Sequence, residues 1–155
     1  MDAAELRATQ APIKDRYKTD PKSAMITLKA KGSIENEGIA CKVETGRALA
    51  IAGLHPATGG SGLELCSGDM LLEALVACAG VTLKAVATAL DVALRGATVS
   101  AEGDLDFRGT LGVDKQAPVG FADIRLRFDL DTDAPQEAID KVIKLTERYC
   151  VIYQT

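Results

Sequence analysis

The segment from Asp69 to about Leu90 most constrains the fold, because it is the longest helical stretch and is apolar on nearly all sides. A helix that is hydrophobic all round is either buried inside a protein or crosses a membrane. From Met70 onward this segment is interrupted by Glu73 and Lys84, which leave only ten uncharged residues between them, too few to span a bilayer. The sequence therefore predicts a central buried helix, capped by Ser67 or Asp69.

Strand patterns flank this helix on both sides. Alternation of apolar and polar residues predicts strands over residues 23–30, 39–44, 47–54, 97–108 and 122–130. The first three suggest an antiparallel meander, and the last two a hairpin with one polar face. The intervening residues 55–68 (HPATGGSGLELCSG) are rich in glycine, proline and serine, which is typical of a loop.

A second helix is predicted over residues 133–150. Asp133 and Gln136 fit a capping box, and Pro135 is tolerated in a first turn. One face of this helix is apolar at helical spacing: Ile139, Val142, Ile143, Thr146, Tyr149 and Cys150. Cys150 is therefore expected to point at the core.

The overall pattern predicts an α+β protein. A chain of 155 residues suits one domain with a real core. Residues 1–22 are mixed in charge and form an N-terminal arm, so the domain is expected over residues 23–155.

The charge balance excludes some partners. A formal net charge of −4 argues against nucleic acid, because binding to phosphates needs a basic surface. The N-terminus has neither the apolar core nor the cleavage site of a signal peptide. We therefore expect a soluble cytoplasmic protein with no membrane partner.

The cysteines are Cys41, Cys66, Cys78 and Cys150. None forms a CxxC pair and the single histidine, His55, is not clustered with them, so no metal site is expected. About 18 Å of helix separates Cys66 from Cys78, which excludes a disulfide between them. By pattern alone Cys78 is a core residue, because free cysteine is among the most buried residue types. Burial without a cationic partner would keep its thiol inert.

Two motifs together change this interpretation. The segment GGSGLELCSGDMLLEALVACAGVTLKAV resembles the central motif of the OsmC/Ohr family, the osmotically inducible and organic-hydroperoxide-resistance proteins. That motif has a glycine-containing loop, a helix start with an acidic residue, and a cysteine inside an apolar helix. The segment ERYCV resembles the second motif, a cysteine that ends the last long helix. The resemblance covers about residues 23–155.

The resemblance implies an OsmC-like fold and an enzymatic activity. The fold has antiparallel sheets, a long central buried helix and a second long helix, in an intertwined homodimer. The implied activity is that of a cysteine-based peroxidase of the oxidative stress response, with no cofactor. Cys78 would attack an organic hydroperoxide, Cys150 would resolve the sulfenic acid as a disulfide, and an external dithiol would reduce it.

The chain departs from the family at the helix start. Family members commonly carry proline and glutamate there, and the glutamate orients an arginine from an early strand turn. Here Ser67, Gly68 and Asp69 occupy these positions, with Asp69 as a shorter acid. The matching turn reads SIENEG and has no arginine, so Arg16 or Arg47 is expected to substitute.

A substrate pocket is expected beside the loop that precedes the helix. Its candidate residues are His55, Gly59, Gly60 and Met70. His55 would be a general base or cation near the pocket, or else a solvated residue of a turn. Gly59 and Gly60 would form a flexible loop over the pocket, since the sequence lacks the lysine of a phosphate loop.

Two other functions fit the same pattern. The missing arginine favours a non-catalytic OsmC-like protein that binds an apolar small molecule in a degenerate site. A long helix wrapped by antiparallel sheet also describes hotdog-type thioesterases, which would require one continuous sheet around the helix.

Overall fold

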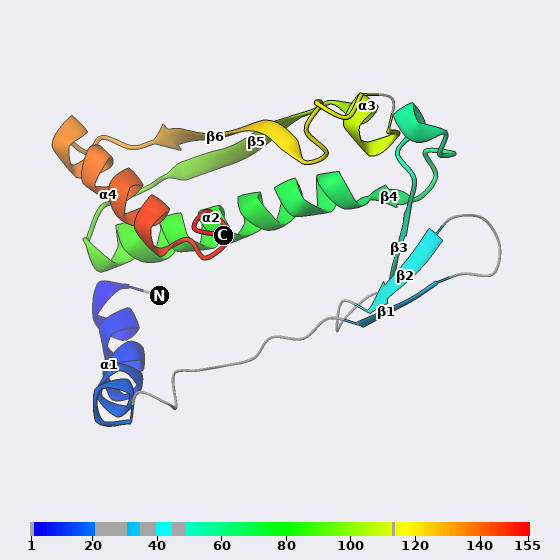
Figure 1. The fold of residues 1–155 in the computed structure, drawn as a ribbon. Coiled ribbons are helices and arrows are strands. Elements are labelled where there is room, and N and C mark those ends of the chain that lie inside the picture. Colours follow the sequence, from blue (N-terminus) through cyan, green and yellow to red (C-terminus); the bar gives the residue numbers. More distant parts are fainter. Residues whose placement is uncertain (1, 21–30, 35–39, 45–48, 113) are drawn as a thin grey trace. The chain divides into compact units, whose positions relative to one another are not determined.

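The computed structural model describes the backbone of residues 2–20, 31–34, 40–44, 49–112 and 114–155 (Figure 1). Side chains are described for the same residues except 9, 13–18, 31–34, 40–44 and 49. The chain divides into two compact units: the first contains residues 1–28, 75–99 and 128–155, and the second contains residues 29–74 and 100–127.

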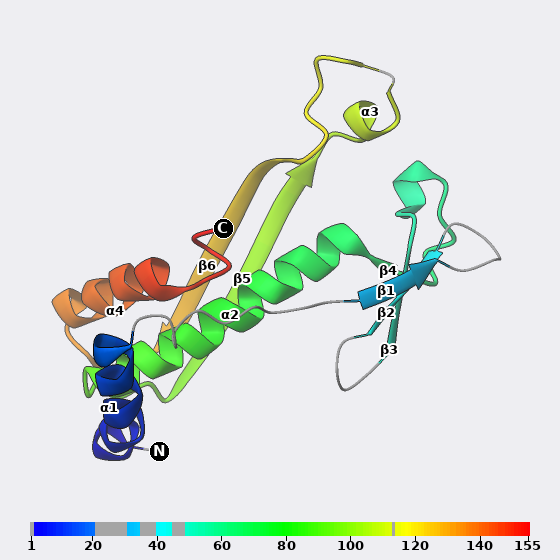
Figure 2. The same ribbon diagram turned by 60° about the horizontal axis from the view of Figure 1, so that its bottom comes forward.

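The first unit is built on the long helix α2 (Ser67–Ala89), which enters it at Leu75. With α2 are α1 (Ala3–Thr19) and α4 (Gln136–Tyr149). Leu83 and Ala87 of α2 form a buried cluster with Val142 of α4, and α4 lies beside α2 in both ribbon views (Figures 1 and 2). Partly buried apolar side chains surround the cluster: Val86, Leu90, Val92, Leu94, Val99, Phe128, Leu130 and Ile143.

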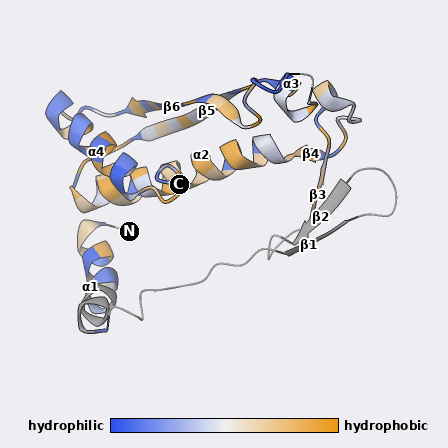
Figure 3. Ribbon diagram, in the orientation of Figure 1, coloured by the Kyte–Doolittle hydropathy of each residue, from blue (hydrophilic) through white to orange (hydrophobic). Residues whose placement is uncertain are grey.

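The predicted helix from Asp69 is present as α2, but its burial is narrower than expected. Figure 3 shows apolar residues along most of its length. The buried residues are Leu75, Ala79, Leu83 and Ala87, which recur every four positions and form one stripe. Val81, on another face, is 73% exposed. Among the described residues, α2 is thus buried along one side, whereas its composition is apolar on most sides.

Of the helices that the structure describes, α2 alone is long and apolar enough to cross a membrane by length and composition. This differs from the sequence argument, which considered only the ten uncharged residues between Glu73 and Lys84 and not the whole helix of 23 residues. The core helix of a globular domain can have the same length and apolar composition, so these two properties do not show that α2 crosses a membrane.

The helix α2 also begins earlier than its predicted cap. Ser67 is the first helical residue, so it is not the residue before the helix. Asp69 lies in the first turn, where its carboxylate suits the positive end of the helix dipole.

The second unit contains a four-stranded sheet in the order β1-β2-β3-β4. Strands β1 (Lys31–Ile34), β2 (Ala40–Glu44) and β3 (Leu49–Gly53) form an antiparallel meander, and β4 (Leu65–Cys66) pairs parallel to β3. This confirms the strands predicted within residues 39–54. The strand predicted over residues 23–30 lies outside the described residues.

The later strand predictions are also observed, except that the first strand ends at Leu105 and its predicted last residues, Phe107 and Arg108, are helical. Strands β5 (Gly96–Leu105) and β6 (Phe121–Asp131) form a two-stranded sheet, and the short helix α3 (Phe107–Thr110) lies between them in the sequence. The outer face of this hairpin is polar, and Arg125 bonds to Asp104 and Asp123 at 2.6 Å. Ile124 alternates with the charged residues of β6, which predicts that it lies on the apolar face, but it is exposed.

The second helix differs from its prediction at both ends. The N-cap of α4 is Pro135, with no side-chain cap. The Asp133 carboxylate instead accepts a hydrogen bond from Arg95, so the capping box is wrong. Tyr149, predicted on the buried face, is 60% exposed. The buried stripe runs through Val142, Thr146 and Cys150, at intervals of four, and Tyr149 falls one position outside it.

Candidate functional site

The structure brings Cys78 and Cys150 together within the first unit. Cys78 lies in the middle of α2 and is half-buried, and Cys150 is the C-cap of α4 and is 1% exposed. Both are free thiols, and a hydrogen bond between their side chains acts on the pKa of each. Periodicity predicted the inward direction of Cys150, and the structure confirms that this side chain is in the core.

Helix packing explains why the two thiols meet. Val142 of α4 lies in the cluster that contains Leu83 of α2. Eight residues after Val142, the same stripe of α4 reaches Cys150. On α2, Cys78 lies five residues before Leu83, so the thiol pair and the core cluster are joined through the same two helices.

The chain after α4 provides the polar groups around Cys78. Residues 151–154 form a turn, in which the backbone N–H of Gln154 donates to the carbonyl of Cys150 at 3.1 Å. The side-chain amide of Gln154 also donates to the carbonyl of Glu147 at 2.9 Å, which ties this turn to the last turn of α4. The backbone N–H groups of Val151 and Ile152 thereby come within reach of the Cys78 sulfur.

These contacts make the two thiols unequal. The pKa of Cys78 lies below its ordinary value, chiefly because the N–H of Ile152 bonds to its sulfur. Partial burial opposes this effect, while the thiol of Cys150, the N–H of Val151 and the hydroxyl of Thr82 lower the pKa further. The pKa of Cys150 is raised, chiefly by burial. Cys78 therefore ionises first, because hydrogen-bond donors stabilise its thiolate and the low-dielectric core disfavours that of Cys150.

Within the described side chains, the groups that lower the pKa of Cys78 are hydrogen-bond donors and not a cation. The two arginines expected near Cys78 lie outside the described side chains. Arg16 lies in α1, but its side chain is outside the described residues, and Arg47 is outside them entirely.

The other predicted site residues, His55, Gly59, Gly60, Asp69 and Met70, belong to the second unit. Asp69 is exposed in the part of α2 that belongs to the second unit, about 13 Å of helix rise before Cys78. Met70 follows it and is half-buried. His55 is the N-cap of a 3₁₀ turn, η2 (Pro56–Thr58), and its Nδ1 accepts a hydrogen bond from the N–H of Ala57 at 3.0 Å. This is the turn-forming role named as the alternative for His55.

The local backbone explains why glycine occupies positions 59 and 60. Gly59 ends η2 with φ at +91°, in the left-handed region that favours glycine. At Gly60 a Cβ atom would lie 1.6 Å from the carbonyl oxygen of Leu54, so no other residue fits without a backbone shift. A substrate role for either glycine stays a prediction.

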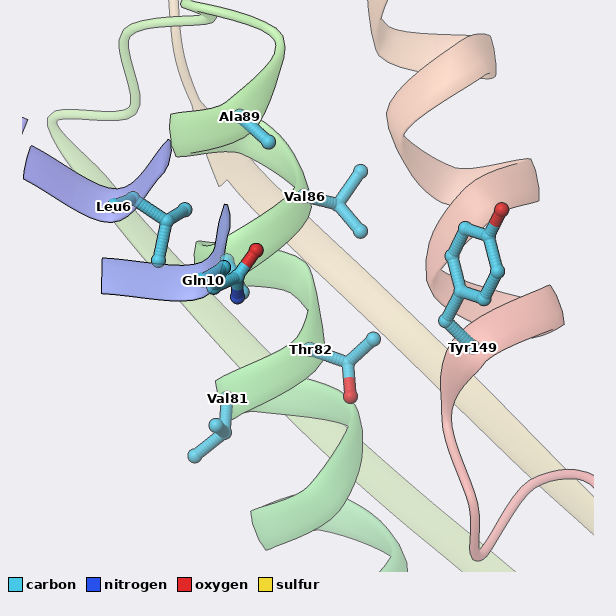
Figure 4. Close-up of a pocket in the computed structure, with 8 residues that line it drawn as sticks. Leu6, Gln10, Val81, Thr82, Val86, Ala89 and Tyr149 are labelled. Atoms are coloured by element: carbon cyan, nitrogen blue, oxygen red, sulfur yellow. The ribbon is translucent and has the colours of Figure 1, made fainter. Parts of the chain in front are cut away.

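A groove of about 500 Å³ lies in the first unit (Figure 4). It is lined by residues of three helices: Leu6, Gln10, Val81, Thr82, Ala85, Val86, Ala89 and Tyr149. Thr82 lines this groove and also bonds to Cys78, one helical turn away on α2. Sequence reasoning missed Thr82, although its position four residues after Cys78 places it on the same helix face.

The unequal pKa values predict a specific pH dependence. We expect alkylation of Cys78 by iodoacetamide to reach half its maximal rate at a lower pH than in the urea-unfolded chain. Only the thiolate reacts, so its rate rises with pH through the pKa and then levels off. Peptide mass spectrometry after timed quenching measures both midpoints. A folded midpoint at or above the unfolded one would contradict the polar environment described here.

Solved structures of OsmC-like proteins share this fold. An OsmC-like protein from Mycoplasma pneumoniae matches with a TM-score of 0.68 at 14% identity, over 83% of this chain and 86% of that one. A Legionella pneumophila structure, described as an organic hydroperoxide resistance protein OsmC, gives 0.64 at 15% identity, over 84% and 88%. The organic hydroperoxide resistance protein OhrB of Bacillus subtilis gives 0.54 at 16% identity, over 83% and 89%.

No curated protein sequence matches the chain. The solved structures establish the α+β OsmC-like fold, and the described strands form two sheets, unlike the single continuous sheet of a thioesterase. The family model described as OsmC-like protein matches residues 60–155, well over half of the sequence and including both Cys78 and Cys150. The chain therefore belongs to the OsmC-like family.

Proposed function

We propose that this protein is a thiol-dependent peroxidase that reduces organic hydroperoxides through Cys78 and Cys150. The observation that carries the proposal is the pairing of two free thiols with opposite pKa shifts. An efficient peroxidatic cysteine needs to be a thiolate, because the thiolate is the nucleophile. A resolving cysteine can stay protonated until the first step is complete.

The proposed reaction balances with one hydroperoxide and one external dithiol. The Cys78 thiolate attacks the terminal oxygen of ROOH and the O–O bond breaks. RO⁻ leaves and takes up a proton as the alcohol, and Cys78 becomes a sulfenic acid. The thiol of Cys150 then displaces water and forms the disulfide. An external dithiol reduces this disulfide by exchange and leaves as its own cyclic disulfide.

The groove beside Thr82 supports an organic substrate. Its lining is largely aliphatic, from Leu6 to Val86 and Ala89, and apolar surface favours an alkyl or aryl group over water (Figure 4). Hydrogen peroxide has no such group and would gain nothing from this surface. The hydroperoxide-resistance names of the Legionella pneumophila and Bacillus subtilis structures support the same substrate class.

The proposal includes a homodimer in the cytoplasm. The exposed apolar side chains of α2, with Val81 the most exposed and Leu71 half-exposed, favour a protein partner over water. A reducing compartment would keep the thiols free and supply the dithiol.

A second candidate function is binding of an apolar small molecule without turnover. The groove favours it, because its volume lies in the range typical of small-molecule pockets. The two functions differ in the fate of the thiols, which remain reduced if the protein only binds.

The proposal predicts a defined product from one equivalent of oxidant. Adding one equivalent of cumene hydroperoxide to the reduced protein is expected to consume two thiols and form the Cys78–Cys150 disulfide. The two sulfurs already share a hydrogen bond, so no large movement is needed. Thiol titration and peptide mapping by mass spectrometry measure this result. Unchanged thiols would favour the binding function, and a disulfide through any other cysteine would overturn the proposed pair.

A further inference from the structure

A separate cavity lies wholly within the second unit. It consists of two adjoining hollows of about 330 and about 160 Å³. Both are lined by His55, Cys66, Gly68, Leu105, Phe107 and Phe121. The larger hollow alone reaches the lower end of the size range of small-molecule sites.

The cavity gathers aromatic residues that are rare in this chain. The whole sequence has three phenylalanines, one histidine and no tryptophan, and two of the phenylalanines and the histidine line this cavity. The rings of His55 and Phe107 stack with centroids 4.9 Å apart and planes 18° apart. Since Nδ1 of His55 accepts the N–H of Ala57, the neutral ring carries its proton on Nε2. These rings offer faces and edges that suit another planar ring.

Two glycines shape the cavity. At Gly103 a Cβ atom would lie 2.5 Å from the ring of Phe121. The ring therefore occupies the space that a side chain at position 103 would need. At Gly68 a Cβ atom would lie 3.5 Å from Leu105 and Phe121 and 3.6 Å from the sulfur of Cys66. These are ordinary contacts, so a methyl group at Gly68 would fill part of the cavity without a clash.

The charge around the cavity favours an uncharged ligand. Asp69 lines the smaller hollow and is exposed, while no lysine or arginine is among the described residues that line either hollow. An anion would therefore meet a carboxylate and no fixed cation. The sulfur of Cys66 adds a soft, polarizable contact, which is favourable at the edge of an aromatic ring.

We infer that this cavity is a binding site for a small, uncharged aromatic molecule. Aromatic stacking and the contact with Cys66 provide its affinity, and the absent side chain of Gly68 provides part of its space. The site is built from residues of the second unit and does not depend on the Cys78–Cys150 chemistry.

The site can be tested with 1-naphthol as the probe and the full chain labelled with ¹⁵N. We expect saturable shifts of the backbone amide signals of Cys66, Gly68, Gly103 and Phe121. Cyclohexanol, which has no aromatic ring, and benzoate, which is an anion, are expected to shift them much less. Shifts confined to the groove residues Val81–Ala89, or equal shifts with cyclohexanol, would overturn the inference.

Two matched variants of α2 test the geometry. Gly68→Ala adds a methyl group inside the cavity and is expected to raise the Kd for 1-naphthol by roughly tenfold. Gly80→Ala adds the same methyl group where the nearest atom belongs to Val99, 3.9 Å away, and is expected to leave the Kd unchanged. Alanine is the better helix former at both positions, so both variants should fold. Equal Kd values for Gly68→Ala and the unchanged chain would refute the site.

Discussion

Replacement of Cys78 with serine is expected to lower the steady-state consumption of cumene hydroperoxide by more than about a hundredfold, to the rate of the dithiol alone. A serine hydroxyl is not ionised near neutral pH, and the N–H groups of Val151 and Ile152 can stabilise an anion only where one forms. The measurement is hydroperoxide loss in the presence of dithiothreitol, with protein-free buffer as the background.

Two further variants separate the proposed roles. Cys150→Ser keeps the attacking thiolate, so without dithiol it should consume one equivalent of hydroperoxide and accumulate a sulfenic acid on Cys78 that dimedone traps. Ala77→Ser places the same hydroxyl one residue before Cys78, at an exposed position, and should keep the full rate. If Cys78→Ser turned over hydroperoxide at the rate of the unchanged chain, Cys78 could not be the nucleophile and the peroxidase proposal would be wrong.

The main elements were predictable from the sequence because their apolar periods are long and regular. The helix from Asp69, the helix that ends at Tyr149 and the β5–β6 hairpin all occur where the pattern predicted them. The errors fall at helix ends and faces. Asp133 bonds to Arg95 instead of capping α4, because a partner 38 residues away competes for its carboxylate. Local spacing carries no information about such a partner.

The candidate site was predictable only in part. Periodicity predicted that Cys78 is a core residue. Only the resemblance of two motifs to those of the OsmC/Ohr family paired it with Cys150. From the sequence we expected a cationic side chain to lower the pKa of Cys78. In the described residues this pKa is lowered chiefly by a backbone N–H, that of Ile152. Every non-proline residue carries this group, so its importance depends on the turn after α4 and leaves no signature in the sequence.

Replacement of Leu83 with alanine is expected to have the largest effect on stability. Leu83 is 2% exposed and lies in the cluster with Ala87 and Val142 that joins α2 to α4. Removing a fully buried leucine side chain costs about 3 to 5 kcal/mol, from lost apolar transfer and from the cavity left behind. Urea denaturation followed by circular dichroism measures the change in the free energy of unfolding.

The matched control is Leu63→Ala, because the Leu63 side chain is 90% exposed and its loss should change stability by less than about 0.5 kcal/mol. Equal losses for the two leucines would contradict the described core. The core also holds the end of α4, and with it Cys150 and the turn at Ile152, against Cys78. A Leu83→Ala protein that still folds should therefore show a Cys78 alkylation midpoint displaced toward that of the unfolded chain, since looser packing weakens the N–H contacts that lower its pKa.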